Sequence, residues 1–128
     1  MDEVIKREEW NSYVKEFNER NGSRATRVEV LSAELGDQEE EELLPLLGIS
    51  LEEKGENAPS IEISLGGETA KEERQLTHMI TRVRNIMRKI GVDLREEALL
   101  IEDEEGTKTI LHFETLPELE PAWRGARI

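Results

Sequence analysis

The chain contains no cysteine, and this absence removes several kinds of site at once. Disulfides, thiolate zinc sites and cysteine nucleophiles all need the thiol group. Aromatic residues are also scarce, at 4% of the sequence, which predicts a small and mainly aliphatic core. No apolar run approaches the roughly 20 residues of a membrane span, and the opening residues Met1-Asp2-Glu3 lack the basic start of a signal peptide. We therefore expect a cytoplasmic protein with no membrane partner.

Basic residues are the minority among the charged side chains. The sequence has 17 Lys and Arg against 30 Asp and Glu, and its net charge is −13. The segment from 71 to 95 departs from this trend, because seven basic and three acidic residues give it a net charge of +4, so the remainder of the chain carries −17. Such an asymmetry bears on solubility and partners rather than on the fold. Most of the acidic residues are expected to form solvated surface.

Length and composition predict a single domain. At 128 residues the chain has the size at which one domain commonly buries one core. We place an α+β domain at residues 1–115. The last segment, 116–128, contains Pro117, Pro121 and Gly125 and is expected to be a loosely ordered tail.

The clearest predicted element is an amphipathic helix near the N-terminus. Trp10, Tyr13, Val14 and Phe17 follow one another at i, i+3, i+4 and i+7, which places them on one stripe of a helix. Asn21-Gly22 supplies the left-handed stop that commonly ends a helix. We expect the aromatic stripe to pack on a sheet rather than to form an exposed binding face.

After this helix the apolar residues alternate with polar ones, as in half-buried strands. The last two of these strands are joined by a loop at 103–107, where Gly106 can take the positive φ of a short hairpin. Short connections of this kind favour antiparallel pairing. The alternation covers 28–30, 47–51, 61–65, 98–102 and 109–114, with Leu47, Ile49 and Leu51 on one face of their strand.

The segment from 76 to 90 carries two competing patterns. Apolar residues recur at intervals of three, four and three from Ile80 to Ile90, which favours a helix over about 79–90. Leu76, His78 and Ile80 alternate instead, and a long bent strand fits the segment nearly as well. The predicted fold is therefore α+β, with an N-terminal amphipathic helix packed on a curved, mainly antiparallel sheet of about six strands, and with 79–90 as either a second helix or a long bent strand.

No motif in the sequence fixes a reaction. The two histidines, His78 and His112, lie 34 positions apart and lack the i, i+4 spacing of a helical metal pair. His78 is the better candidate for a catalytic base, although a structural role is favoured for both. The acidic stretch at 103–106 is too short for a calcium loop. We therefore predict no cofactor and no metal, and a noncatalytic protein is favoured over an enzyme.

A series of short motifs runs along the chain in a definite order. The motifs are Arg7-Glu8-Glu9-Trp10, Val28-Glu29-Val30, Leu46-Leu47-Gly48-Ile49, Ile61-Glu62-Ile63, Leu76-Thr77-His78, Leu100-Ile101 and Thr109-Ile110-Leu111. Their order resembles a bacterial family of unknown function, number 5335 among such families, over about residues 5 to 114. The resemblance implies one small domain and brings no activity, substrate or catalytic residue.

The basic segment is the candidate interaction surface. The preferred hypothesis is a small, acidic, noncatalytic interaction domain that binds a protein partner or a second copy of itself through residues 74–95. Binding of nucleic acid through Arg82, Arg84, Arg88 and Lys89 is disfavoured by the acidic remainder and by the lack of aromatic residues among these cations. A small enzyme centred on His78 has less support. The arginines are as readily explained by pairing with acidic residues of the same chain. The full candidate surface is Arg74, His78, Arg82, Arg84, Arg88 and Lys89.

Overall fold

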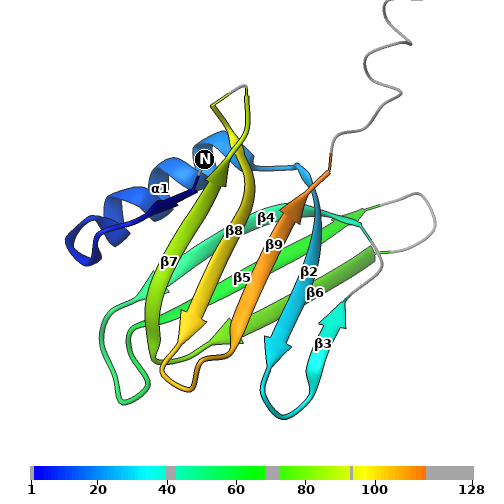
Figure 1. Cartoon of the computed structure of the whole chain (residues 1–128). Coiled ribbons are helices and arrows are strands. Elements are labelled where there is room, and N and C mark those ends of the chain that lie inside the picture. The colour runs from blue at the N-terminus through cyan, green and yellow to red at the C-terminus, as the bar shows by residue number, and fades with distance from the viewer. Residues whose placement is uncertain (1, 40–42, 69–72, 93, 115–128) are drawn as a thin grey trace, which may run out of the picture.

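The computed structural model describes residues 2–39, 43–68, 73–92 and 94–114. This part of the chain folds as one helix, a short 3₁₀ turn and nine strands (Figure 1). The 3₁₀ turn η1 spans Arg7–Glu9 and leads directly into the helix α1, Trp10–Asn21. The strands are β1 (Asp2–Val4), β2 (Ala25–Ser32), β3 (Gly36–Glu39), β4 (Leu44–Glu52), β5 (Ser60–Glu68), β6 (Glu73–Ile80), β7 (Val83–Ile90), β8 (Glu96–Asp103) and β9 (Lys108–Phe113).

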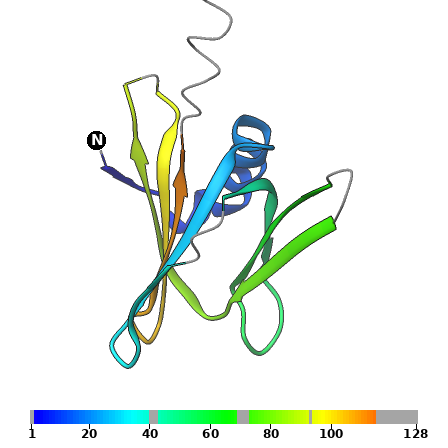
Figure 2. The same ribbon diagram turned by 90° about the vertical axis from the view of Figure 1, so that its right-hand side faces the viewer.

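All strand pairs are antiparallel, and together they form one open, sharply bent sheet. Its order is β1-β7-β8-β9-β2-β4-β5-β6, with β3 beside β2. β2 and β4 pair only at Ala25 with Pro45 and Thr26 with Leu44, so the sheet bends there into a larger limb (β1, β7, β8, β9, β2 and β3) and a smaller limb (β4, β5 and β6). Figure 2 shows the limbs diverging toward one end, where α1 lies between them.

The α+β class and the antiparallel sheet confirm the prediction, whereas the expected number of about six strands was too low. β1 has three residues, all of them exposed, and so lacks the apolar alternation that marks a strand. β3 has the sequence Gly-Asp-Gln-Glu and carries no apolar residue at all. Both strands are formed through backbone pairing with a longer neighbour, which leaves no hydrophobic pattern in the sequence.

The predicted helix at 79–90 was wrong, and the alternative of a long bent strand is the better description. The chain runs from β6 into β7 through Thr81 and Arg82, where Arg82 has a φ of 51° and turns the chain from one limb to the other. The pairing of β7 with β8 shifts register between Val83 and Asn85. Because this bulge adds a residue, Val83 and Ile86 both face the core although they are three positions apart, which imitates helical spacing.

The helix packs as predicted. Its stripe of Trp10, Tyr13, Val14 and Phe17 is buried and joins one hydrophobic cluster with residues of both limbs. The ring centroids of Phe17 and Phe113 lie 5.8 Å apart, and this contact packs the helix against β9. The expected left-handed stop at Gly22 was wrong, because Gly22 has a φ of −56° and the positive φ, 72°, belongs to Ser23.

A second irregularity changes the face of one predicted core residue. β4 and β5 shift register between Leu46 and Gly48, so Leu46 and Ile49 are buried while Leu47 is 56% exposed. The expected inward face therefore holds for Ile49 and Leu51, whereas Leu46 takes the buried position that was expected for Leu47.

No helix in the described residues is both long enough and apolar enough to cross a membrane. The predicted tail, 116–128, lies outside the described residues.

Candidate functional site

The basic segment forms β6, β7 and the turn that follows them, and its side chains do not gather into one cationic face. On β7, Arg84 pairs with Glu102 at 3.4 Å and Lys89 with Glu97 at 3.9 Å. Arg82 is exposed at the junction of the two limbs. Arg74 belongs to β6, but its side chain lies outside the described part of the structure.

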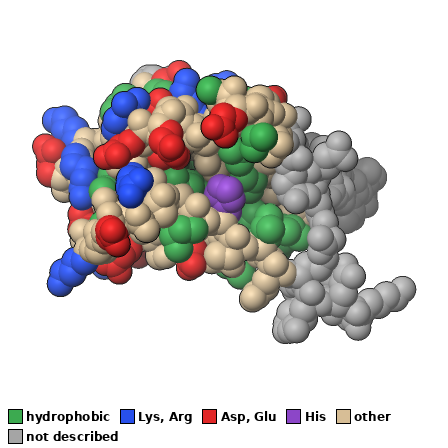
Figure 3. Space-filling view, turned by 90° about the horizontal axis from the view of Figure 1, so that it is seen from below, with side chains coloured by type: hydrophobic (Ala, Val, Ile, Leu, Met, Phe, Trp, Pro, Cys, Tyr) green, Lys and Arg blue, Asp and Glu red, His purple; other side chains and the backbone are tan. Residues whose placement is uncertain are grey.

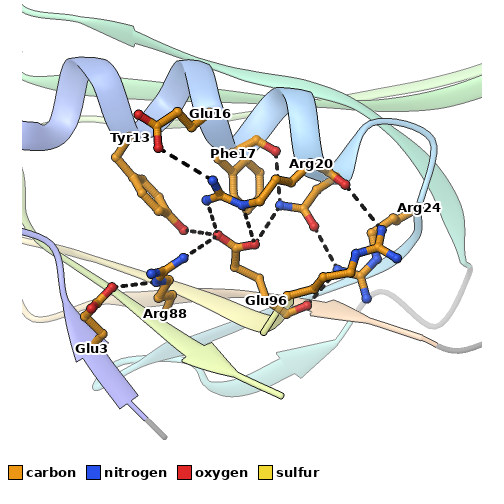
Figure 4. Close-up of polar contacts among 10 residues, drawn as sticks. Glu3, Tyr13, Glu16, Phe17, Arg20, Arg24, Arg88 and Glu96 are labelled. Carbon is orange, nitrogen blue, oxygen red and sulfur yellow. Dashed lines mark hydrogen bonds and ion pairs between the residues drawn. The ribbon is translucent and has the colours of Figure 1, made fainter. Parts of the chain in front are cut away.

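Arg88 belongs to a buried cluster around Glu96, the first residue of β8 (Figure 4). The Glu96 side chain is fully buried. Its Oε2 accepts hydrogen bonds from Tyr13 Oη at 2.8 Å, Arg20 Nη2 at 2.6 Å and Arg88 Nη1 at 3.3 Å. Its Oε1 accepts from Arg20 Nε at 3.2 Å and Asn21 Nδ2 at 3.1 Å. One carboxylate therefore connects α1 to β7 and β8.

The cluster extends to two further elements. Arg88 Nε donates to Glu3 of β1 at 2.6 Å, and Arg24, just before β2, donates to the backbone oxygen of Glu96 at 2.6 Å. Figure 4 shows these side chains converging from the helix and from several strands. Among the described residues, no buried side-chain nitrogen or oxygen lacks a hydrogen-bond partner.

The pKa values in this cluster follow from its geometry. Burial alone raises the pKa of Glu96, but hydrogen bonds from Arg20, Asn21 and Tyr13 outweigh it and lower the pKa to about 2. Burial, together with the neighbouring Glu96 charge, raises the pKa of Tyr13. Glu96 is thus an ionised acceptor and Tyr13 a neutral donor at neutral pH. Both oxygens of the carboxylate are already engaged, so this arrangement fixes the helix and is poorly suited to proton transfer.

The two histidines occupy different environments. His112 Nε2 lies 2.8 Å from Glu29 Oε1 on the larger limb, and this contact is the main cause that lowers the pKa of Glu29. His78 is half-buried on β6, and burial lowers its pKa. Within the described ranges, no three histidine or acidic residues are placed to hold a metal ion. His78 and Arg88 both belong to the predicted surface, but His78 lies on β6 of the smaller limb and Arg88 lies in the Glu96 cluster of the larger limb.

Two hollows lie over the larger limb. One, of about 450 Å³, is lined by Arg27, Lys89, Ala98 and His112 together with acidic residues. A smaller one, of about 170 Å³, is lined by Met87, Leu100 and Ile110 among others. Both are open, and the cations of the first have carboxylate neighbours, as in the contacts of Arg27 with Glu114 and Lys89 with Glu97.

The edges of the sheet differ in how they are protected. An unpaired edge presents backbone N–H and C=O groups that invite another strand, and natural proteins shorten, charge or cover such edges. β1 has only three residues and includes Asp2 and Glu3, and β3 has only four and includes Asp37. These two edges are thus short and charged.

The side of β4 that β2 leaves unpaired is covered by the helix. Asn18 of α1 uses its side-chain amide as a strand would use its backbone, donating through Nδ2 to the Ile49 oxygen and accepting from the Ile49 nitrogen through Oδ1, both at 2.8 Å. Gly48 permits this approach, since a Cβ there would lie 3.3 Å from Asn18 Oδ1. The backbone of Leu46 is bonded by Ser23 and Arg24.

β6 is the least protected edge among the described residues, because its charged residues, Glu73 and Arg74, stand only at its first two positions. It ends the strand order, and its one strand partner is β5. From Gln75 to its end at Ile80 it carries no Asp, Glu, Lys or Arg, although such residues make up 37% of the chain. Gln75, Thr77 and Met79 are exposed, with Met79 at 52%. In Figure 3, seen from below, hydrophobic side chains lie at the surface beside a histidine, next to a region rich in charged side chains.

Neither Glu96 nor Asn18 was singled out from the sequence. Glu96 is one of 30 acidic residues, and the partners that distinguish it are 8 to 83 positions away. The uncharged stretch of β6 was visible in the sequence, but it becomes informative only when β6 is known to be an edge.

Comparison with known proteins gives a family and no activity. No curated protein and no solved structure matches the chain. The model of a family of unknown function, DUF5335, matches residues 1–122, somewhat more than the 5 to 114 expected from the motifs. The chain therefore belongs to this family of unknown function.

Proposed function

We propose that this protein is a small noncatalytic interaction domain that binds another protein chain through the β6 part of the 74–95 segment. The observation that carries the proposal is the contrast among sheet edges. The other edges are short and charged or are covered by α1, whereas β6 is eight residues long and, after Glu73 and Arg74, uncharged to its end at Ile80. An edge of this kind suits strand addition, in which backbone hydrogen bonds supply the affinity.

The two alternatives have less support. Arg84, Arg88 and Lys89 each contact a carboxylate of the same chain, so binding nucleic acid would require these pairs to break. An enzyme centred on His78 would need partner groups near that side chain, and the charged cluster is built around Glu96 instead.

Strand addition is tested with a neutral probe and with the chain itself. The probe is a fluorescent eight-residue peptide of alternating threonine and valine, whose binding is followed by anisotropy. Self-association is followed by sedimentation velocity over a range of protein and salt concentrations. We expect saturable binding of the probe, or charge-sensitive self-association that strengthens as salt screens repulsion between acidic copies.

Two lysine variants locate the contact. Met79→Lys places a charge on the β6 edge and should abolish binding, because lysine is a common device for blocking exposed edges. Leu47→Lys is the matched control, since Leu47 is 56% exposed but lies on the inner strand β4. A chain that neither binds the probe nor self-associates would overturn the proposal, as would equal effects of the two variants.

A further inference from the structure

We infer that the strand added to β6 is a basic, extended segment of a different protein, with apolar residues at alternate positions. This inference rests on the proposed function and names the partner that the charges and the register of β6 favour.

The positions of the apolar residues in the added strand follow from the alternation of inward and outward side chains on β6. Leu76 and Ile80 point toward the core, Ile80 being buried and Leu76 partly buried against the hydrophobic cluster. Side chains on neighbouring strands align on the same face of a sheet. Every second residue of an added strand therefore lies beside Leu76, His78 or Ile80, where an apolar side chain extends the core between the limbs.

The remaining positions of the added strand face the outer side of the smaller limb. There Met79 pairs with Glu62 of β5, and Glu62 pairs in turn with Ser50 of β4. Strands lie roughly 5 Å apart, so a residue placed beside Met79 is about 10 Å from Glu62 at the backbone, within one Debye length at moderate salt. A lysine or arginine at this position is attracted to the glutamate.

The charge of the whole molecule favours the same partner. The chain has a net charge of −13, and on β7 the cations Arg84, Arg88 and Lys89 are already paired with carboxylates of the chain. A second copy brings an equal negative charge, and its β6 offers no complementary charge from Gln75 to Ile80. A basic segment is steered toward β6, because complementary charge raises the association rate.

The experiment compares three fluorescent peptides that alternate valine with lysine, threonine or glutamate. At low salt the lysine peptide should bind at least about tenfold more tightly than the glutamate peptide, with the threonine peptide between them, and the difference should shrink as salt rises. Hydrogen exchange should slow at the amides of Gln75 to Ile80 when the lysine peptide binds.

Two methylated peptides separate strand pairing from simple attraction of charge. Methyl groups are placed on the backbone nitrogens of either the odd or the even residues of the lysine peptide. Only one set of N–H groups faces β6 in a paired strand, so one methylated peptide should lose binding and the other should retain it. Equal binding of both, or equal binding of the lysine and glutamate peptides, would overturn the inference. If the threonine peptide binds at β6 as tightly as the lysine peptide, the basic partner is wrong while the interaction domain stands.

Discussion

At the scale of single residues, Glu96 is the side chain on which most of the polar structure depends. Its carboxylate is fully buried and contacts two guanidinium groups, a phenol and an amide. A buried ion pair gains little over an apolar replacement of the whole pair, but the loss of one partner leaves charges buried without compensation. If Glu96 is removed, Arg20 and Arg88 each lose their buried partner and keep only a more exposed one, Glu16 for Arg20 and Glu3 for Arg88.

Glu96→Gln should lower the free energy of unfolding at neutral pH by about 3–5 kcal/mol, the usual cost of breaking a buried ion pair. The folded-state pKa of about 2 lies below the ordinary value of a glutamate, so the stabilisation is fully present above about pH 4.3 and is lost as pH falls through 2. The difference between wild type and variant should therefore shrink between about pH 5 and pH 2. Urea titrations at several pH values measure it.

Glu97→Gln is the control for this experiment, because Glu97 is adjacent but its side chain is 51% exposed. It should change stability by less than about 1 kcal/mol, as is usual for a surface pair. A difference between wild type and Glu96→Gln that stays constant from neutral pH to pH 2 would contradict the assigned role of the carboxylate.

At the scale of elements, the sequence was sufficient to predict the helix and the hairpin that have a regular local period of apolar residues. The helix stripe from Trp10 to Phe17 and the hairpin of β8 and β9 were predicted correctly, because each has a regular period and a recognisable turn. The register shifts near Gly48 and Val83 were not predictable, since a bulge forms where pairing with another strand requires it. Asn18 was missed for a related reason, because its role depends on Ile49, which is 31 positions away.

Trp10→Ala should lower the free energy of unfolding by about 3–5 kcal/mol, the usual cost of truncating a buried aromatic residue. The Trp10 side chain is only 2% exposed, and its Nε1 donates to the Ile5 oxygen at 3.0 Å. Lys15→Ala, on the exposed side of the same helix, should have little effect. The urea midpoint, followed by far-ultraviolet circular dichroism, compares the two variants. A near-zero shift for Trp10→Ala would mean that this side chain does not dock the helix.

At the scale of the whole molecule, the acidic excess acts on every state of the protein. A net charge of −13 on a small domain repels itself, and each pair of like charges 10 Å apart costs about 0.4 kcal/mol in water without salt. Exposed ion pairs such as Arg7 with Glu53 oppose this repulsion only weakly. The buried Glu96 cluster is screened much less by salt than these surface charges.

Added salt should therefore stabilise the fold. Between about 0.01 M and 0.1 M sodium chloride the Debye length falls from about 30 Å to about 10 Å, and the free energy of unfolding should rise by on the order of 1 kcal/mol. Thermal unfolding over a salt series measures the change. Glu19→Lys combined with Glu56→Lys, both at exposed positions, changes the net charge from −13 to −9 and should reduce the gain. A fall in stability with salt would show that attraction outweighs repulsion.

The large sequence separation between the members of the Glu96 cluster also determines when the cluster can form during synthesis. Tyr13 and Glu96 are 83 positions apart, and at about 5–20 residues per second the chain needs roughly 4 to 17 seconds to extend from one to the other. Throughout that interval the aromatic stripe of α1 has been made, while the carboxylate that anchors it has not. During that interval the helix can already contact β4, through Asn18 and Ile49, but its polar anchor on the larger limb can form only after Glu96 has been added.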